Sequence, residues 1–396
     1  MTTRKRMNKQ FTFQNKMILL ISPQSWGTMH ISKHHYALAL AELGNTVYFL
    51  NPPCNELKQS VEMYKYNNNL FIITYKLQFN FNIRFHFRLL YDLLMRRQIR
   101  YLQNIFNRKF DVLWCFDANL YSDLTLFNGD IVIYHVVDQV FEKHSIKPAI
   151  KSDVIISVAD NILQNFAYLP VKKLLLNHGL ADCFANKAKS YLEHICMSKV
   201  SNNKIKIGYI GNLLISALDR NTLKTLISKY MNIEFHFWGC YEIVGCNIAA
   251  DESMEVVQFI DFLKQMGNVT LHGPQEPCRV AEEVHDMDAF LVCYDIKKDA
   301  NNGSNTHKLL EYLSTGKVVI SNHISSYKTC HELIQMLDYD TVDYVQLFEN
   351  TILNISYYNC IEKQKKRINF ALQNRYSSQI HKIESCITQL GLCEPI

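Results

Sequence analysis

The sequence predicts an α/β protein in which two doubly wound domains each contain a parallel sheet. The first observation is that apolar runs at 17–22 and 46–50 flank a segment, 31–43, whose apolar residues recur at helical spacing. Strands separated by helices in this way form right-handed crossovers and a parallel sheet covered on both faces. Further strand candidates in the first half lie at 70–74, 112–116, 131–135 and 154–158.

The second observation is that the same alternation begins again after residue 204. An apolar run at 205–210 ends at Gly211, and the helical pattern of 218–230 separates it from a run at 234–238. Apolar runs closed by glycine are typical of buried strands that turn sharply. This series continues with strands at 269–272, 289–294 and 317–321 and with helices at 280–284 and 306–315.

The length of 396 residues suits two domains of about 150–200 residues each better than one core. The stretch 187–204 is polar and weakly patterned, so we place the boundary there. The predicted organisation is a basic N-terminal extension 1–16, an N-terminal domain 17–186, a linker 187–204, a C-terminal domain 205–343 and helices in 344–396.

Composition excludes several classes of protein. With 48% apolar and 20% charged residues, general disorder is excluded. A net charge of +5 does not identify a nucleic-acid binder, and we expect no nucleic-acid partner. The twelve cysteines form no C-x-x-C pair, which favours free thiols in a reducing cytoplasm. Because residues 1–16 lack the apolar run of a signal peptide and no later run could span a bilayer, we expect a cytoplasmic protein.

The segment 301–321 is the strongest candidate for a binding site. A loop of small residues leads into a predicted helix, whose first amides and dipole favour an anion. Asn305 or Thr306 (or Ser304) can cap this helix, and Lys308 can add a positive charge toward a pyrophosphate. Glu311, three residues later on a neighbouring part of the same face, can accept hydrogen bonds from ribose hydroxyls. The alternative is an ordinary capped helix with a Lys–Glu pair.

This segment resembles the nucleotide-sugar-binding stretch of GT-B glycosyltransferases, especially the family 4 and family 1-like enzymes of bacterial polysaccharide assembly. The sequence departs from their pattern at Val318, where proline is usual, and at Gly303, where many relatives carry a second acidic residue. The positions in register are Asn305, Lys308, Glu311, Tyr312, Leu313, Gly316, Lys317, Val318 and Val319.

Other stretches resemble the same enzymes in the same order. They are 34–53, 177–184, 207–212, 268–274 with 288–292, and 374–376 before a helix. The resemblance implies two facing Rossmann-like domains, an acceptor-side one and a nucleotide-sugar-binding one, whose ligand sites adjoin one cleft. It also implies that the helices of 344–396 pack back on the N-terminal domain.

The resemblance further implies an activity. A sugar would pass from a nucleotide diphosphate sugar to a hydroxyl of a glycan or lipid-linked glycan, in synthesis of a bacterial capsule, exopolysaccharide or lipopolysaccharide. It implies retention of anomeric configuration and no metal or cofactor. Gly211 and Lys308 would then contact the donor. Arg220 would contact it too, or would lie on a solvated helix face. The alternatives are a sugar-nucleotide 2-epimerase and a catalytically inactive partner subunit of a polysaccharide-synthesis complex.

The N-terminal domain contributes two candidate catalytic residues, His135 and Asp138, which follow a predicted strand. Asp138 can act on an acceptor hydroxyl as a base or can orient it, and His135 can contact the donor. The alternative is that both are strand-end residues satisfied by the backbone. His30 and His34 are four residues apart, but no accompanying H-E-x-x-H glutamate supports a zinc site.

The stretch 82–109 is basic and amphipathic. It contains seven cations and one acidic residue, Asp92, interleaved with apolar residues. Two interpretations remain open from the sequence. The segment could lie on the anionic inner face of a membrane, or it could be a helix packed on the N-terminal sheet with a solvated arginine face.

Overall fold

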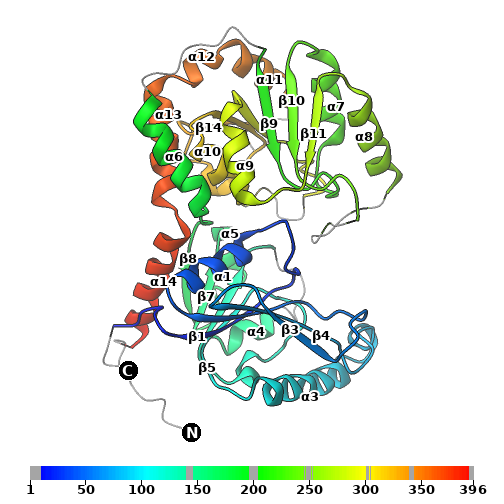
Figure 1. Ribbon diagram of the computed structural model, residues 1–396, viewed down its shortest axis with the longest axis vertical. Coiled ribbons are helices and arrows are strands. Elements are labelled where there is room, and N and C mark those ends of the chain that lie inside the picture. Colours follow the sequence, from blue (N-terminus) through cyan, green and yellow to red (C-terminus); the bar gives the residue numbers. More distant parts are fainter. Residues whose placement is uncertain are drawn as a thin grey trace. The chain divides into compact units, whose positions relative to one another are not determined.

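A computed structural model describes residues 10–139, 146–195, 204–244, 246, 251, 253–299, 303, 305–338 and 343–391. The chain forms two compact units (Figure 1). The first comprises Met1–Trp26, Ser32–Asn177 and Ser377–Ile396, and the second comprises Gly27–Ile31 and His178–Tyr376. Among the described residues, no helix is both long and apolar enough to cross a bilayer.

The first unit contains an eight-stranded sheet in the order β3-β4-β2-β1-β5-β6-β7-β8. All neighbouring pairs are parallel except β3 and β4. Its central strands are continuous apolar runs because helices cover both faces of a parallel sheet. The strands are β1 (Met17–Ile21), β2 (Thr46–Leu50), β3 (Val61–Lys65), β4 (Leu70–Tyr75), β5 (Phe110–Cys115), β6 (Gly129–Val136), β7 (Val154–Ser157) and β8 (Lys172–Leu175). The helices are α1 (Ser32–Glu42), α2 (Ile83–His86), α3 (Arg88–Phe106), α4 (Lys147–Ile150) and α5 (Asp160–Gln164).

The second unit contains a six-stranded parallel sheet in the order β11-β10-β9-β12-β13-β14. The strands are β9 (Lys206–Ile210), β10 (Glu234–Trp238), β11 (Val269–Gly273), β12 (Ala289–Val292), β13 (Val318–Ser321) and β14 (Ile334–Met336). The helices are α6 (Asp182–His194), α7 (Arg220–Lys229), α8 (Met254–Gln265), α9 (Pro277–Glu283), α10 (Lys308–Ser314), α11 (Tyr344–Leu353), α12 (Ile355–Tyr358) and α13 (Ile361–Gln373).

The last helix, α14 (Tyr376–Leu390), crosses back to the first unit, as predicted. The backbone N–H of Phe11 donates to the Thr388 hydroxyl at 3.1 Å, and that of Phe13 donates to Glu384 Oε1 at 2.6 Å. The other predicted C-terminal helices, α11 to α13, belong to the second unit instead. Helix α11, for example, is joined to β13 of the second unit, because the buried Tyr344 hydroxyl donates to the carbonyl oxygen of Ile320 at 2.8 Å.

The chain passes from the first unit to the second at Asn177/His178, before the linker expected at 187–204. Helix α6 belongs to the second unit because Ala188 and Ile195 pack against Ile368 of α13. The backbone N–H of Leu180 also donates to the carbonyl of Asn374 at 2.7 Å. Residues 196–203 of the expected linker, like most of the basic extension 1–16, lie outside the described residues.

A buried arginine ties α13 to the sheet of the second unit. Arg367 is fully buried, and its guanidinium donates to the carbonyl oxygens of Leu333 (2.9 Å), Gly316 (3.0 Å) and Tyr358 (2.7 Å). Burial lowers the pKa of Arg367 to about 10, so the side chain remains cationic at neutral pH. Three chain segments are therefore joined through one charged group.

We expect Arg367→Met to destabilise the second unit by about 3–5 kcal/mol, because three buried carbonyl groups lose their donor. Urea unfolding followed by hydrogen exchange of α13 and β13 measures this loss. The control is Lys366→Met at the exposed neighbouring position, which should leave the urea midpoint nearly unchanged. Equal effects of the two substitutions would contradict the assigned role of Arg367.

Candidate functional site

The second sheet has a topological switch point between β9 and β12. From β9 the chain continues to β10 and β11 on one side, and from β12 it continues to β13 and β14 on the other. In open α/β sheets, ligands bind outside the carboxyl ends of the strands at such a point. The residues that follow β9 and β12 are therefore the first place to look for a binding site.

Strand β9 ends at a glycine turn whose backbone only glycine adopts readily. Gly211 has φ +146° and Gly239, at the end of β10, has φ +143°. A Cβ atom on Gly239 would lie 2.0 Å from the carbonyl oxygen of Gly211. The two turns therefore pack backbone against backbone, and a side chain at either position would disturb the end of β9.

The ammonium group of Lys308, the first residue of α10, lies against this turn. Nζ is 3.2 Å from the Tyr209 hydroxyl and 4.3 Å from the centre of its ring, and it lies over the Tyr294 ring at 5.2 Å. A Cβ on Gly211 would lie 2.6 Å from Nζ. Burial lowers the pKa of Lys308, but Tyr209 and Tyr294 outweigh it and leave the pKa raised. A permanent positive charge is thus held at the switch point.

Glu311 accompanies Lys308 on the same short helix. Its side chain is buried, and burial raises its pKa to about 7 although the charge of Lys308 opposes the shift. No hydrogen bond to its carboxylate occurs within the part of the chain that the structure describes. Tyr312, the next residue, fixes the helix to β9: its hydroxyl accepts from the N–H of Ile210 at 2.8 Å and donates to the Ile210 carbonyl at 3.2 Å.

The start of α10 differs from the predicted capped helix. Its N-cap residue is His307, without a side-chain cap, so Asn305 and Thr306 lie in the preceding loop and Ser304 lies outside the described residues. The N–H groups of Leu309 and Leu310 donate to the carbonyls of Thr306 and His307 at 3.3 Å. Since these first-turn amides are already used, the positive character of the site comes mainly from Lys308.

Gly303, where the resemblance pattern has a second acidic residue, cannot carry a side chain in this structure. Its φ is +58°, and a Cβ would lie 2.2 Å from the carbonyl oxygen of His323. Its N–H donates to Asp299 Oδ2 at 2.8 Å, and its carbonyl accepts from the N–H of Ser325 at 2.8 Å. The path of the loop therefore requires glycine, and Glu311 remains the one acidic position of the pattern.

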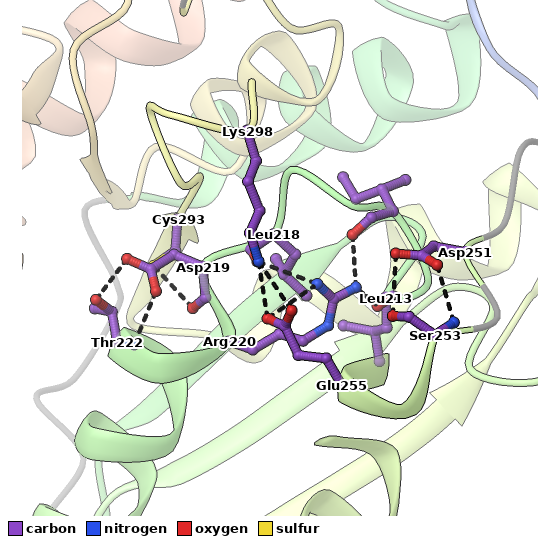
Figure 2. A network of polar contacts seen from close by, with 11 residues as sticks. Leu213, Leu218, Asp219, Arg220, Thr222, Asp251, Ser253, Glu255, Cys293 and Lys298 are labelled. Atoms are coloured by element: carbon purple, nitrogen blue, oxygen red, sulfur yellow. Dashed lines mark hydrogen bonds and ion pairs between the residues drawn. The ribbon is translucent and has the colours of Figure 1, made fainter. Parts of the chain in front are cut away.

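Arg220 has a different position from the one that the sequence suggested (Figure 2). The side chain is buried at the start of α7, and its guanidinium donates to the carbonyl oxygens of Ile215 (2.6 Å), Leu213 (3.4 Å) and Leu218 (3.4 Å). Glu255 lies 4.0 Å away and is shared with Lys298 at 2.9 Å. Arg220 therefore holds the loop that follows Gly211, and we assign it to positioning rather than to ligand contact.

The first sheet has its own switch point, between β1 and β5. Lys33, in the first turn of α1, is buried and donates to Gln24 Oε1. Burial lowers the pKa of Lys33 to about 8, and Asp138 and Asp117 oppose this shift. Asp117, two residues after the end of β5, accepts from the N–H groups of Asn119 (2.6 Å) and Leu120 (2.7 Å). Sequence reasoning missed Lys33 and Asp117, although Asp117 directly follows a predicted strand.

The two catalytic candidates of the first unit, His135 and Asp138, differ in burial. His135 is buried, stacks on Phe116 with ring centres 4.6 Å apart, and accepts from Trp114 Nε1 at 3.3 Å. Burial and the charge of Lys33 lower its pKa to about 3, so the ring is neutral and lies in an aromatic part of the core. Asp138 is exposed after β6, beside Lys33, and remains the candidate that a substrate can reach.

The structure gives no support to a metal site at His30 and His34. His34 Nε2 lies 3.1 Å from the carbonyl oxygen of Ser25, and its ring stacks on Phe49. No group of three or more His, Cys, Asp or Glu side chains with metal-binding geometry occurs in the described part of the chain.

Comparison with known proteins shows the fold. Sucrose-phosphate synthase from Thermosynechococcus elongatus superposes with a TM-score of 0.66 at 11% identity, covering 95% of this chain and 99% of that one. A glycosyltransferase from Rickettsia africae gives 0.64 at 12%, covering 96% and 100%. Anabaena HepE in complex with UDP and glucose gives 0.60 at 10%, covering 94% and 100%. The sequence matches no protein-family model and no curated protein. The predicted GT-B fold, with two Rossmann-like domains, is confirmed.

We expect Glu311 to titrate near pH 7, because burial disfavours its charged form. The measurement is ¹³C NMR of the glutamate carboxyl carbons, with Glu311→Gln to identify the resonance. Lys308→Met should raise the midpoint further, since the lysine charge stabilises the carboxylate. A midpoint at the ordinary glutamate value, or no response to Lys308→Met, would contradict this geometry.

Proposed function

We propose that this protein is a glycosyltransferase that moves a sugar from a nucleoside diphosphate sugar to an acceptor hydroxyl. The observation that carries the proposal is the Lys308 ammonium held against the Gly211 turn at the switch point, with Glu311 on the same helix. A cation suits a pyrophosphate, a bare glycine backbone allows its close approach, and a carboxylate suits ribose hydroxyls. The diphosphate and the ribose are the two parts of the donor other than its base and its sugar.

The chemistry that the site would perform is stabilisation of a leaving group. When the bond from the sugar to the diphosphate breaks, negative charge grows on the diphosphate. Lys308 is already fixed by Tyr209 and needs no reorganisation to meet that charge. We propose that Asp138 of the first unit takes or orients the proton of the acceptor hydroxyl. The transfer as proposed uses no metal ion, because Lys308 supplies the positive charge.

The proposal can be extended to the kind of donor, the kind of acceptor and the location of the protein. HepE was solved with UDP and glucose, and an Escherichia coli neighbour was solved with UDP-2-fluoro glucose, so UDP-sugars are the first donors to test. The resemblance of the 301–321 segment to enzymes of bacterial polysaccharide assembly supports a glycan or lipid-linked glycan acceptor and a cytoplasmic location. We also propose retention of anomeric configuration, which the anomeric proton of the product reports in ¹H NMR.

We expect the purified protein to release a nucleoside diphosphate from one member of a panel of nucleotide sugars. Lys308→Met should lower kcat/KM roughly 100- to 1000-fold, because a preorganised charge facing the leaving group is lost. The measurement is nucleoside diphosphate release with and without glycan acceptors. The control is Lys229→Met at the exposed end of α7, which should retain activity.

Other outcomes of that screen would reject the proposal. Isomerisation of the donor sugar without an acceptor would indicate a 2-epimerase. Absence of turnover with every donor, together with a requirement for a second protein, would indicate an inactive partner subunit. Full activity of Lys308→Met would show that the donor binds elsewhere.

We expect affinity for the nucleotide sugar to increase about tenfold from pH 6 to pH 8. Burial raises the pKa of Glu311 to about 7, so a carboxylate that accepts ribose hydroxyls is scarce at pH 6 and prevalent at pH 8. The diphosphate of a nucleotide sugar has no proton to lose in this range. Calorimetric titration measures the dissociation constant, and Glu311→Gln should abolish its pH dependence. An unchanged pH profile in that variant would remove Glu311 from the site.

A further inference from the structure

Helix α2 and the first two turns of α3 expose an unusual set of large apolar side chains. Soluble proteins seldom expose contiguous apolar groups without an interaction partner. The exposed residues, with their exposed fractions, are Phe85 (64%), Phe87 (66%), Leu89 (86%), Leu90 (46%) and Leu93 (63%). We refer to these five residues as the apolar tip.

The apolar tip is not needed to hold α3 in place. The opposite stripe of the helix supplies its packing, because Tyr91, Met95, Ile99, Leu102 and Phe106 recur at helical spacing and are buried in the core of the first unit. This stripe alone accounts for the amphipathic helix that the sequence predicted. The exposed leucines and phenylalanines therefore require a separate explanation.

Positive charge continues along the exposed face of α3 beyond the apolar tip. Arg96, Arg97 and Arg100 are exposed and form no ion pair within the described residues. The acidic residue of the helix, Asp92, is partly buried and already paired with Arg88 at 3.2 Å and with Lys147 at 3.1 Å. The exposed face is consequently apolar at one end, cationic along the next turns, and without a free carboxylate of its own.

We propose that this face docks on an anionic lipid surface. The apolar tip enters the boundary between headgroups and acyl chains, and the three arginines contact lipid phosphates. This is the arrangement of an interfacial helix that lies in the membrane plane. The charge of the arginines selects an anionic lipid surface over a neutral one. The inference adds a location to the proposed transferase and does not depend on its chemistry.

The test is co-sedimentation of the full-length protein with phosphatidylcholine vesicles and with mixed phosphatidylcholine–phosphatidylglycerol vesicles. Wild-type protein should partition onto the mixed vesicles and less so at high salt. Substituting Arg96, Arg97 and Arg100 together by Gln should lower the partition coefficient about 100-fold. Leu89→Ser with Leu93→Ser should lower it about tenfold.

The matched control replaces Lys58, Lys189 and Lys328, three exposed lysines outside this face, by Gln. It removes the same charge and should retain vesicle binding. Failure of wild-type protein to bind mixed vesicles, or equal losses in both triple variants, would overturn the inference. A further outcome would also overturn it: wild-type protein that binds no vesicles and forms a dimer in light scattering, which the leucine variant dissociates. The face would then contact a second copy of the chain. Donor turnover, measured on the same samples, tests the transferase proposal independently.

Discussion

The second unit depends on the burial of one ammonium group. Removing a lysine charge from water costs several kcal/mol unless partners replace the lost hydration. Lys308 has such partners in Tyr209, from β9, and Tyr294, which follows β12. Because these are the two strands that flank the switch point, the sheet topology itself provides the environment of the lysine. Glycine at 211 suits this arrangement, since a Cβ there would lie 2.6 Å from Nζ and the φ of +146° disfavours other residues.

Three buried cations in the same unit serve different purposes, and the chemistry of their head groups explains the division. Arg367 and Arg220 each present several donors in a plane, and both satisfy backbone carbonyls of neighbouring segments. Lys308 presents a compact charge to two neutral tyrosines, which bind it without cancelling it. The arginines therefore stabilise loops, whereas the lysine leaves a positive charge available to an anion.

The pattern of apolar residues along the sequence was sufficient to predict the central strands of both sheets. The strands that it did not predict are explained by their position in the sheet. Strands β3, β8 and β14 were not predicted, and all three are edge strands. Edge strands are half exposed, so their sequences lack the continuous apolar runs that identify β1, β5 or β12. The sequence was similarly informative for Lys308 and Glu311, which share one short helix. It could not predict that Arg220 faces inward or that His135 lies in an aromatic core, because both depend on residues distant in the chain.

The two switch points each bury a lysine, but their surroundings differ in charge. The positive charge of Lys33 in the first unit faces the carboxylates of Asp117 and Asp138, which balance it. These carboxylates raise the pKa of Lys33, but burial has the larger effect and lowers it to about 8. Lys308 in the second unit packs against Tyr209 and Tyr294, and its pKa is raised. The acid near it, Glu311, has a pKa raised by burial to about 7 and is only partly ionised at neutral pH. A balanced site with an exposed carboxylate suits a neutral hydroxyl compound, because no uncompensated positive charge is left for a phosphate. A cation that is only partly compensated suits a diphosphate. The residues around each lysine thus support placing the donor in the second unit and the acceptor in the first.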